Sequence, residues 1–135
     1  MSFVEVPHTA DIKIRATAPT LEKLFSEAFA ALMQVIYGPD RNGGKKREIA
    51  LDAEDHESLM RDFLSEVLFI AEVDGMVFSS ADIHIEGRHL SAVLDGEPFD
   101  RRRHAMGTEV KGISYSGLAI TRDANGYMLD IVFDV

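Results

Sequence analysis

The stretch DIKIRATAPTLEKLFSEAFAALMQVI, residues 11–36, contains the two hydrophobic periodicities that decide the fold. Through Thr17 apolar and polar side chains alternate, which is typical of a strand with one buried and one solvated face. From Leu21 to Ile36 apolar side chains recur at offsets of three and four, which indicates an amphipathic helix. A half-buried strand followed directly by such a helix predicts a helix packed on a sheet.

Capping residues predict where two helices begin and end. Thr20 is a favourable N-cap for the first helix, and Gly38 stops it. Asp55 can cap a second amphipathic helix over residues 56–73, and Gly75 is placed to end it.

The rest of the chain alternates like strands or carries turn residues. In chain order we expect residues 3–6 to lead into the first strand, a basic loop at 40–46, a strand at 48–52, a hairpin turning at Gly87-Arg88, an irregular loop at 97–107, and a final hairpin of strands 108–121 and 127–135. The predicted order is β-α-β-α-β-β-β-β in one domain, residues 1–135. This is an α+β fold, with two helices packed on a largely antiparallel or mixed sheet.

Composition excludes several classes of site. The 135 residues suffice for one hydrophobic core, and the absence of cysteine removes disulfides, thiolate zinc sites and cysteine nucleophiles. No apolar run approaches the roughly 18 to 20 residues that a membrane-spanning helix needs, and residues 1–5 do not resemble a signal peptide. We therefore expect a cytoplasmic protein that does not engage a membrane.

Charge is unevenly distributed along the chain. The net charge of −9 argues against broad nucleic-acid binding, because phosphate contacts need a cationic surface. Seven of the 14 Lys and Arg residues lie within residues 41–47 and 101–103. An acidic body with basic loops suits divalent cations or a basic partner protein, and no stable direct binding of nucleic acid is expected.

Oxygen donors recur on the polar sides of the predicted strands. Asp11, Asp130 and Asp134 lie there, and Val135, the last residue of the sequence, adds a terminal carboxylate. Because hard divalent cations prefer oxygen ligands, this set predicts a cation site, with solvated strand faces as the alternative. Lys111 is a lone cation in a mostly apolar strand, placed to neutralise a carboxylate or position a phosphate, unless it is an ordinary surface lysine.

Two further features complete the candidate site. His8 lies three residues before Asp11. A basic segment is formed by Arg101, Arg102, Arg103 and His104, and its adjacent guanidinium groups suit bidentate capture of phosphate or carboxylate groups. The alternative is internal pairing with Glu97, Asp100 and Glu109. We expect the N-terminal, basic and C-terminal segments to meet at one site centred on Asp11. No nucleophile–base arrangement is evident, so no catalytic residue is predicted.

Three segments resemble the archease family. They are His8-Thr9-Ala10-Asp11-Ile12, the block from Gly96 to His104 that leads into Val110-Lys111-Gly112-Ile113-Ser114-Tyr115, and the C-terminal Asp130-Ile131-Val132-Phe133-Asp134-Val135. They follow one another in the order typical of the family. The chain departs from the family pattern at Ser116, where many members carry a histidine.

The resemblance implies a function and a site. It implies a non-catalytic protein cofactor of an RtcB-type RNA ligase in tRNA splicing and RNA repair, which promotes the GTP-dependent guanylylation and multiple turnover of that ligase. It also implies a divalent metal, Ca²⁺ or in the cell Mn²⁺ or Mg²⁺, at Asp11, Asp134 and Val135. By the same resemblance Lys111 is the functionally required lysine.

Two other classes of function stay open from the residues. The carboxylates would serve equally in a stand-alone metal-dependent phosphoester hydrolase, which needs a general base, and His8 is the candidate for that role. A metal-free interaction module would use its basic loops to dock an acidic partner.

Overall fold

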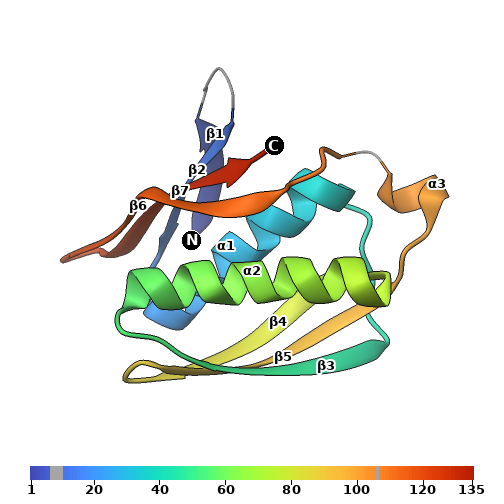
Figure 1. Ribbon diagram of the computed structural model, residues 1–135. Coiled ribbons are helices and arrows are strands. Elements are labelled where there is room, and N and C mark those ends of the chain that lie inside the picture. The colour runs from blue at the N-terminus through green and yellow to red at the C-terminus, as the bar shows by residue number, and fades with distance from the viewer. Residues whose placement is uncertain (7–10, 106) are drawn as a thin grey trace.

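The computed structural model describes residues 1–6, 11–105 and 107–135, and it contains three helices and seven strands within those ranges (Figure 1). In chain order these are β1 (Ser2–Val6), β2 (Ile12–Ala18), α1 (Leu21–Tyr37), β3 (Lys45–Asp52), α2 (His56–Asp74), β4 (Met76–Glu86), β5 (His89–Pro98), α3 (Arg101–His104), β6 (Gly112–Asp123) and β7 (Gly126–Asp134). The predicted α+β class and its two long helices are confirmed. Within the described ranges no helix is long and apolar enough to cross a membrane.

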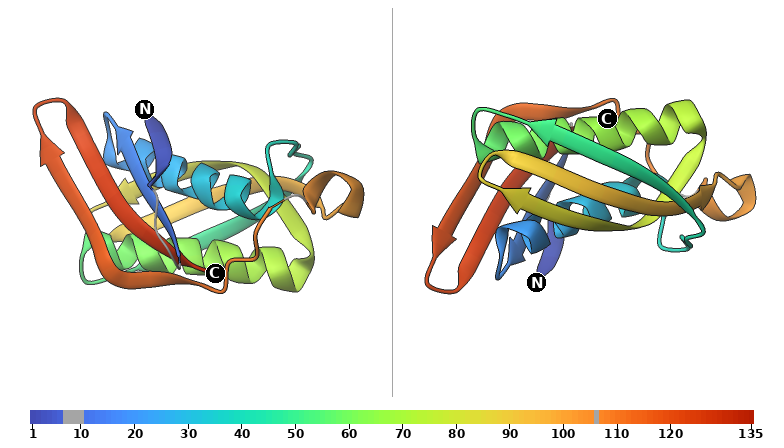
Figure 2. Two further views of the ribbon diagram at one scale, coloured as in Figure 1. Left: turned by 90° about the horizontal axis from the view of Figure 1, so that it is seen from above. Right: turned by 90° about the horizontal axis from the view of Figure 1, so that it is seen from below.

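The strands form two antiparallel sheets rather than the one that was expected. The first has the order β1-β2-β7-β6 and the second the order β3-β5-β4. Figures 1 and 2 show α1 and α2 between the two sheets. Such a helical layer needs apolar residues on more than one side of a helix, and α1 has them, since Ala28, Ala31 and Met33 are all inaccessible to solvent.

Both long helices are capped as the sequence predicts. The Thr20 hydroxyl accepts a hydrogen bond from the Lys23 amide at 3.2 Å, and a carboxylate oxygen of Asp55 accepts one from the Ser58 amide at 2.7 Å. Gly75 ends α2 in the left-handed conformation, with φ of 61°, where glycine is strongly favoured. These local interactions fix the helix ends without help from the sheets.

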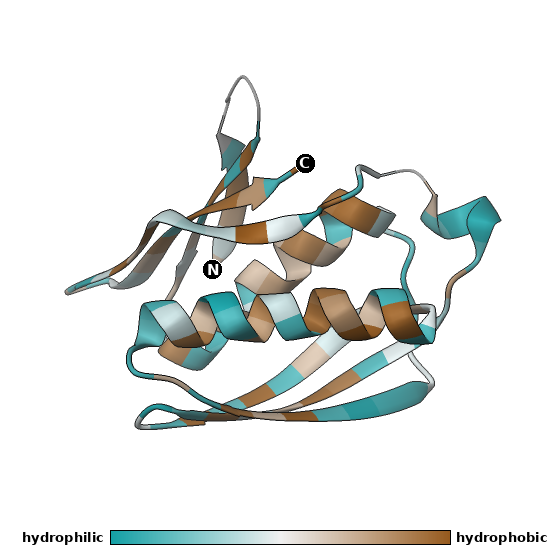
Figure 3. Ribbon diagram, in the orientation of Figure 1, coloured by the Kyte–Doolittle hydropathy of each residue, from teal (hydrophilic) through white to brown (hydrophobic). Residues whose placement is uncertain are grey.

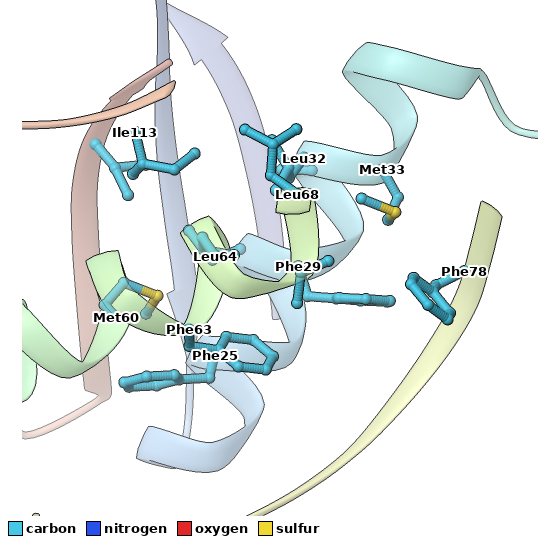
Figure 4. Close-up of a cluster of buried hydrophobic side chains, with 14 of the residues drawn as sticks. Phe25, Phe29, Leu32, Met33, Met60, Phe63, Leu64, Leu68, Phe78 and Ile113 are labelled. Atoms are coloured by element: carbon cyan, nitrogen blue, oxygen red, sulfur yellow. The ribbon is translucent and has the colours of Figure 1, made fainter. Parts of the chain in front are cut away.

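An aromatic cluster joins the two helices at the centre of the core (Figure 4). The ring of Phe63 on α2 lies 6.0 Å from that of Phe25 and 6.5 Å from that of Phe29, both on α1. All three side chains are at most 1% exposed. Figure 3 shows the alternation of hydrophobic and hydrophilic residues along α2 that produces this one-sided burial.

Four local features differ from the sequence prediction. Residues 2–6 form a separate edge strand, β1, paired with β2, and Lys45 and Lys46 belong to β3 rather than to a loop. The predicted irregular loop contains the short helix α3, because the side chain of Asp100 accepts a hydrogen bond from the Arg102 amide and so caps a single turn. In addition, β6 begins at Gly112, four residues later than expected.

Candidate functional site

One end of the first sheet brings together three distant parts of the chain. There β2 begins, β7 ends and β6 begins, with Ile12 paired to Phe133 and Gly112 paired to Asp134. Continued one residue beyond the Ile12–Phe133 pair, the antiparallel register places Asp11 opposite Asp134. The start of β2 and the end of β7 therefore meet, while residues 7–10 of the predicted N-terminal segment lie outside the described residues.

The two aspartates lie on the solvent side of this sheet end. Successive side chains of a strand point to opposite faces, and Phe133, next to Asp134, is completely buried. Ile12, next to Asp11, packs against the same core. Asp134 is exposed and Asp11 is half-buried. A Cβ atom at Gly112 would lie 3.8 Å from Oδ2 of Asp134, so this carboxylate lies close to the surface of β6.

Main-chain contacts hold Lys111 beside Asp134. Its amide donates a 2.7 Å hydrogen bond to the carbonyl oxygen of Asp134. The segment before it is fixed to the end of α1, because the Thr108 amide donates to the Val35 carbonyl oxygen at 2.8 Å. Gly107 lies so close to this helix that a Cβ atom there would fall 2.2 Å from the Val35 oxygen. The buried side chain of Val110 anchors the same segment.

The donor set at this sheet end suits a hard cation. Two carboxylates on neighbouring strands repel each other unless a positive charge lies between them. Ca²⁺, Mg²⁺ and Mn²⁺ take such oxygen ligands and complete their coordination with water. The residues that the structure describes contain no group of three His, Cys, Asp or Glu side chains placed to share a metal ion. The predicted third protein ligand is the carboxylate of Val135, while His8 lies outside the described residues.

Asp130 occupies a different position from the one predicted for a site residue. It lies in the middle of β7, four residues before Asp134, and pairs with Arg15 of β2. Arg15 Nε donates to Asp130 Oδ1 at 2.8 Å, and the hydrogen bond raises the pKa of the arginine. This cross-strand pair separates Asp130 from the carboxylates at the sheet end.

The basic segment does not join the site, and the prediction that all three segments meet is wrong on this point. Figures 1 and 2 show α3 well apart from the C-terminal end of β7. The reason is topological, because α3 follows β5 of the second sheet, whereas Asp134 ends a strand of the first.

Internal pairing takes up half of the basic segment. Arg103 binds Glu97 with both terminal nitrogens, at 2.5 and 3.1 Å, and also contacts Asp40 at 3.3 Å. The His104 ring is buried; its Nδ1 accepts from the Asp100 amide at 2.8 Å, and its Nε2 lies 3.2 Å from Glu97. The hydrogen bonds from Arg103 foremost lower the pKa of Glu97 to about 2. Arg103 and His104 therefore hold α3 in place, while the side chains of Arg101 and Arg102 are exposed.

The whole chain matches one protein family. The family described as the Archease protein family (MTH1598/TM1083) matches residues 3–135. The chain belongs to the archease family. Archease sequences from three organisms illustrate the similarity: 38% identity to that of Pyrococcus furiosus over 95% of this chain and 94% of the relative, 35% to that of Methanosarcina mazei over 95% and 92%, and 35% to that of Methanopyrus kandleri over the full length of both.

Two solved structures share the fold of this chain. The solution structure of Methanobacterium thermoautotrophicum protein 1598 superposes with a TM-score of 0.86 over 98% of both chains, at 25% identity. The crystal structure of an archease from Thermotoga maritima, described as a possible chaperone, gives a TM-score of 0.69 over 98% of this chain and 94% of that one, at 23% identity. The second likeness supports the fold alone.

The sequence offers Glu97 as an internal partner of the arginines, and the pairing with Arg103 bears this out, but its second contact in this archease was missed. Its carboxylate accepts hydrogen bonds from Arg103 and, at 2.7 Å, from the Asn42 amide, and so ties α3 to the loop after α1. Asn42 lies 55 residues before Glu97, so no local pattern carries a signal for that contact. The exposure of Phe69 and Val73 on α2 was missed as well. Both lie off the apolar stripe of this helix, which the sequence pattern shows.

Proposed function

We propose that this archease is a non-catalytic protein cofactor of an RtcB-type RNA ligase, promoting its GTP-dependent guanylylation and its multiple turnover in tRNA splicing and RNA repair. The observation that carries the proposal is the juxtaposition of Asp11 with Asp134 beside Lys111 at one exposed sheet end. The three segments that carry the family resemblance contribute all of these residues. We propose the cytoplasm as the compartment in which it acts.

A divalent cation would be held by Asp11, Asp134 and the carboxylate of Val135. When bound, the cation would supply positive charge that polarises the oxygen atoms it contacts. The two strands hold the carboxylates at an exposed sheet end, where a partner can approach them. Lys111 adds a cation whose main-chain position is fixed by Asp134.

Exposure of the group favours a cofactor over an enzyme. An enzyme site commonly lies in a cleft that excludes water and surrounds its substrate. Here Lys111, Asp134 and Val135 are all exposed. A charged group presented in this way suits insertion into a partner's site, where the partner completes the surroundings.

The test is a guanylylation assay of an RtcB-type ligase with GTP and Mn²⁺, with and without this protein. Asp11→Asn and Asp134→Asn are each expected to remove most of the stimulation while keeping the far-ultraviolet circular dichroism spectrum. Asp82→Asn is the matched control, because this carboxylate is 77% exposed on the other sheet. Full stimulation by both site variants contradicts the proposal. Metal-dependent turnover of a phosphoester by the purified protein alone would assign the carboxylates to a hydrolase.

A further inference from the structure

The C-terminal half of α2 carries two large apolar side chains that point away from the core. Phe69 is 59% exposed and Val73 is 64% exposed. Residues four apart lie on the same side of a helix, so the two side chains are neighbours. The core-facing residues of this half, such as Val67 and Ala71, are at most 2% exposed, so Phe69 and Val73 lie off the buried side of the helix.

Phe99 is a third exposed apolar residue at the same end of α2. Its amide donates a 2.8 Å hydrogen bond to the carbonyl oxygen of Gly75, the residue that ends α2. Its ring is 45% exposed and packs 6.2 Å from that of Tyr37. Figure 1 shows the chain after β5 passing the C-terminal end of α2. We call Phe69, Val73 and Phe99 the α2-end patch.

The clustering of these residues is the informative observation. Seven large hydrophobic side chains are exposed among the described residues, and three of them form the α2-end patch. Single exposed apolar side chains are ordinary on soluble proteins, whereas grouped ones mark interaction sites. Large aromatic residues are also over-represented among the side chains that dominate binding energies.

The rim of the patch on α2 is acidic. Glu66 and Glu72 lie three residues before and after Phe69, so both are its neighbours on the helix surface. Of the carboxylates at the ends of this segment, Asp62 pairs with Arg61 at 3.7 Å and Asp74 with Arg47 of β3 at 3.1 Å, so Glu66 and Glu72 carry the negative charge beside Phe69. The C-terminal end of α2 adds the partial negative charge of the helix dipole, and its last turn carries no basic residue.

We propose that the α2-end patch docks a positively charged surface of the RtcB-type ligase that bears apolar side chains, an inference that rests on the proposed function. A second copy of this chain is a poor occupant, because pairing two such helices would bring the same carboxylates together in a protein of net charge −9. Figures 1 and 2 show the end of α2 apart from the end of β7, so one large partner can engage the patch and the Asp11–Asp134 group together.

The decisive variant is Phe69→Ser combined with Val73→Ser. Serine has a helix propensity close to that of Phe and Val, and both side chains are exposed, so the fold is retained. Val4→Ser is the matched control, because Val4 is a 55% exposed apolar residue that lies in β1 of the first sheet and not on α2. Two quantities are measured: the Kd for the ligase by biolayer interferometry, and the guanylylation rate as a function of archease concentration.

We expect the double variant to raise both the Kd and the half-stimulating concentration by about tenfold or more, with the plateau of stimulation unchanged. Glu66→Gln combined with Glu72→Gln should also weaken binding and should reduce its salt dependence. Val4→Ser should bind like the unsubstituted protein.

Three results overturn the inference. One is an unchanged Kd for the double variant while the unsubstituted protein binds and stimulates, which leaves the proposed function standing. Another is a lowered plateau with an unchanged Kd, which would place the patch in activation rather than docking. The third is concentration-dependent self-association that the double variant abolishes, which would make a second copy the occupant. Absence of both binding and stimulation by the unsubstituted protein overturns the proposed function and this docking surface together.

Discussion

The amide of Lys111 donates a 2.7 Å hydrogen bond to the carbonyl oxygen of Asp134. This bond joins the residue that carries the site's cation to one that carries its anion through their main chains. Side-chain substitutions at either position therefore leave the bond itself in place. The charges of the site can be altered one at a time without moving the strands that hold them, which makes the following predictions separable.

Metal binding and stability should be linked at Asp134. In EDTA, Asp134→Asn is expected to gain about 0.2–1 kcal/mol of stability, because carboxylates on neighbouring strands repel each other. Ca²⁺ should raise the Tm of the unsubstituted protein, since a ligand that binds the folded state stabilises it, and should do so much less for the variant. Thermal unfolding followed by circular dichroism, with and without Ca²⁺, measures both effects.

The control for this prediction is Asp82→Asn, which should respond to Ca²⁺ as the unsubstituted protein does. An equal rise in Tm for the unsubstituted protein and for Asp134→Asn would show that Ca²⁺ binds elsewhere.

Lys111 should matter for activation and not for metal binding. Lys111→Ala is expected to lose most of the stimulation of guanylylation, because its charge stands at the exposed sheet end, whereas the carboxylates that bind Ca²⁺ remain. Isothermal titration calorimetry with Ca²⁺ should give an affinity no weaker than that of the unsubstituted protein, since a nearby positive charge has been removed. Simultaneous loss of Ca²⁺ binding would assign Lys111 a structural role instead.

Periodicity predicts those parts of the fold that local interactions decide. The stripe from Leu21 to Ile36, the Thr20 and Asp55 caps and the turn at Asn125-Gly126 all depend on residues close in sequence, and all occur as expected. The division into two sheets depends instead on which strands pair across the helical layer. An alternating strand pattern shows which side is buried but not against which sheet.

The candidate site likewise contains residues that strand alternation places correctly and a segment that it does not place. Asp11 and Asp134 were placed correctly relative to the core, because strand alternation fixes the face of each. The basic segment was misplaced because its position is set by Glu97, which binds Arg103 and also the Asn42 amide. The contact with Asn42 spans 55 residues and has no sequence period. The family resemblance indicates that the N-terminal, basic and C-terminal segments share a function. It does not indicate which of them lie next to one another in space.

The Glu97–Arg103 pair predicts a pH-dependent stability. The folded protein holds the pKa of Glu97 at about 2, below the ordinary glutamate value of about 4.3. A carboxyl group with a lowered folded pKa stabilises the fold above the unfolded value and loses that contribution as the pH falls toward the folded value. Glu97→Gln is therefore expected to cost about 2–3 kcal/mol at pH 7, the scale of hydrogen bonds to charged groups. This difference should shrink between pH 4.3 and 2.

Urea unfolding of both proteins at several pH values measures the Glu97 effect. The control is Glu86→Gln, an exposed glutamate of β4, for which a change within about 0.5 kcal/mol is expected at every pH. A pH-independent loss in Glu97→Gln would show that packing, and not the charge of Glu97, holds α3.

Truncation of two phenylalanines of α2 should change the stability of the fold to very different extents. Phe63 is completely buried between Phe25 and Phe29, so Phe63→Ala is expected to cost about 3–5 kcal/mol in the free energy of unfolding, as lost burial plus a cavity. Phe69 lies six residues later with 59% of its surface exposed, so Phe69→Ala should change stability by no more than about 0.5 kcal/mol.

The same urea unfolding experiment compares the two variants of α2. A large loss in Phe69→Ala would mean that its ring packs inside the fold, and the α2-end patch would then lose its main residue. A small loss, together with weakened binding of the ligase, would separate the two faces of one helix by their functions. The inner face would then serve folding, and the outer face would keep an aromatic side chain that folding does not require.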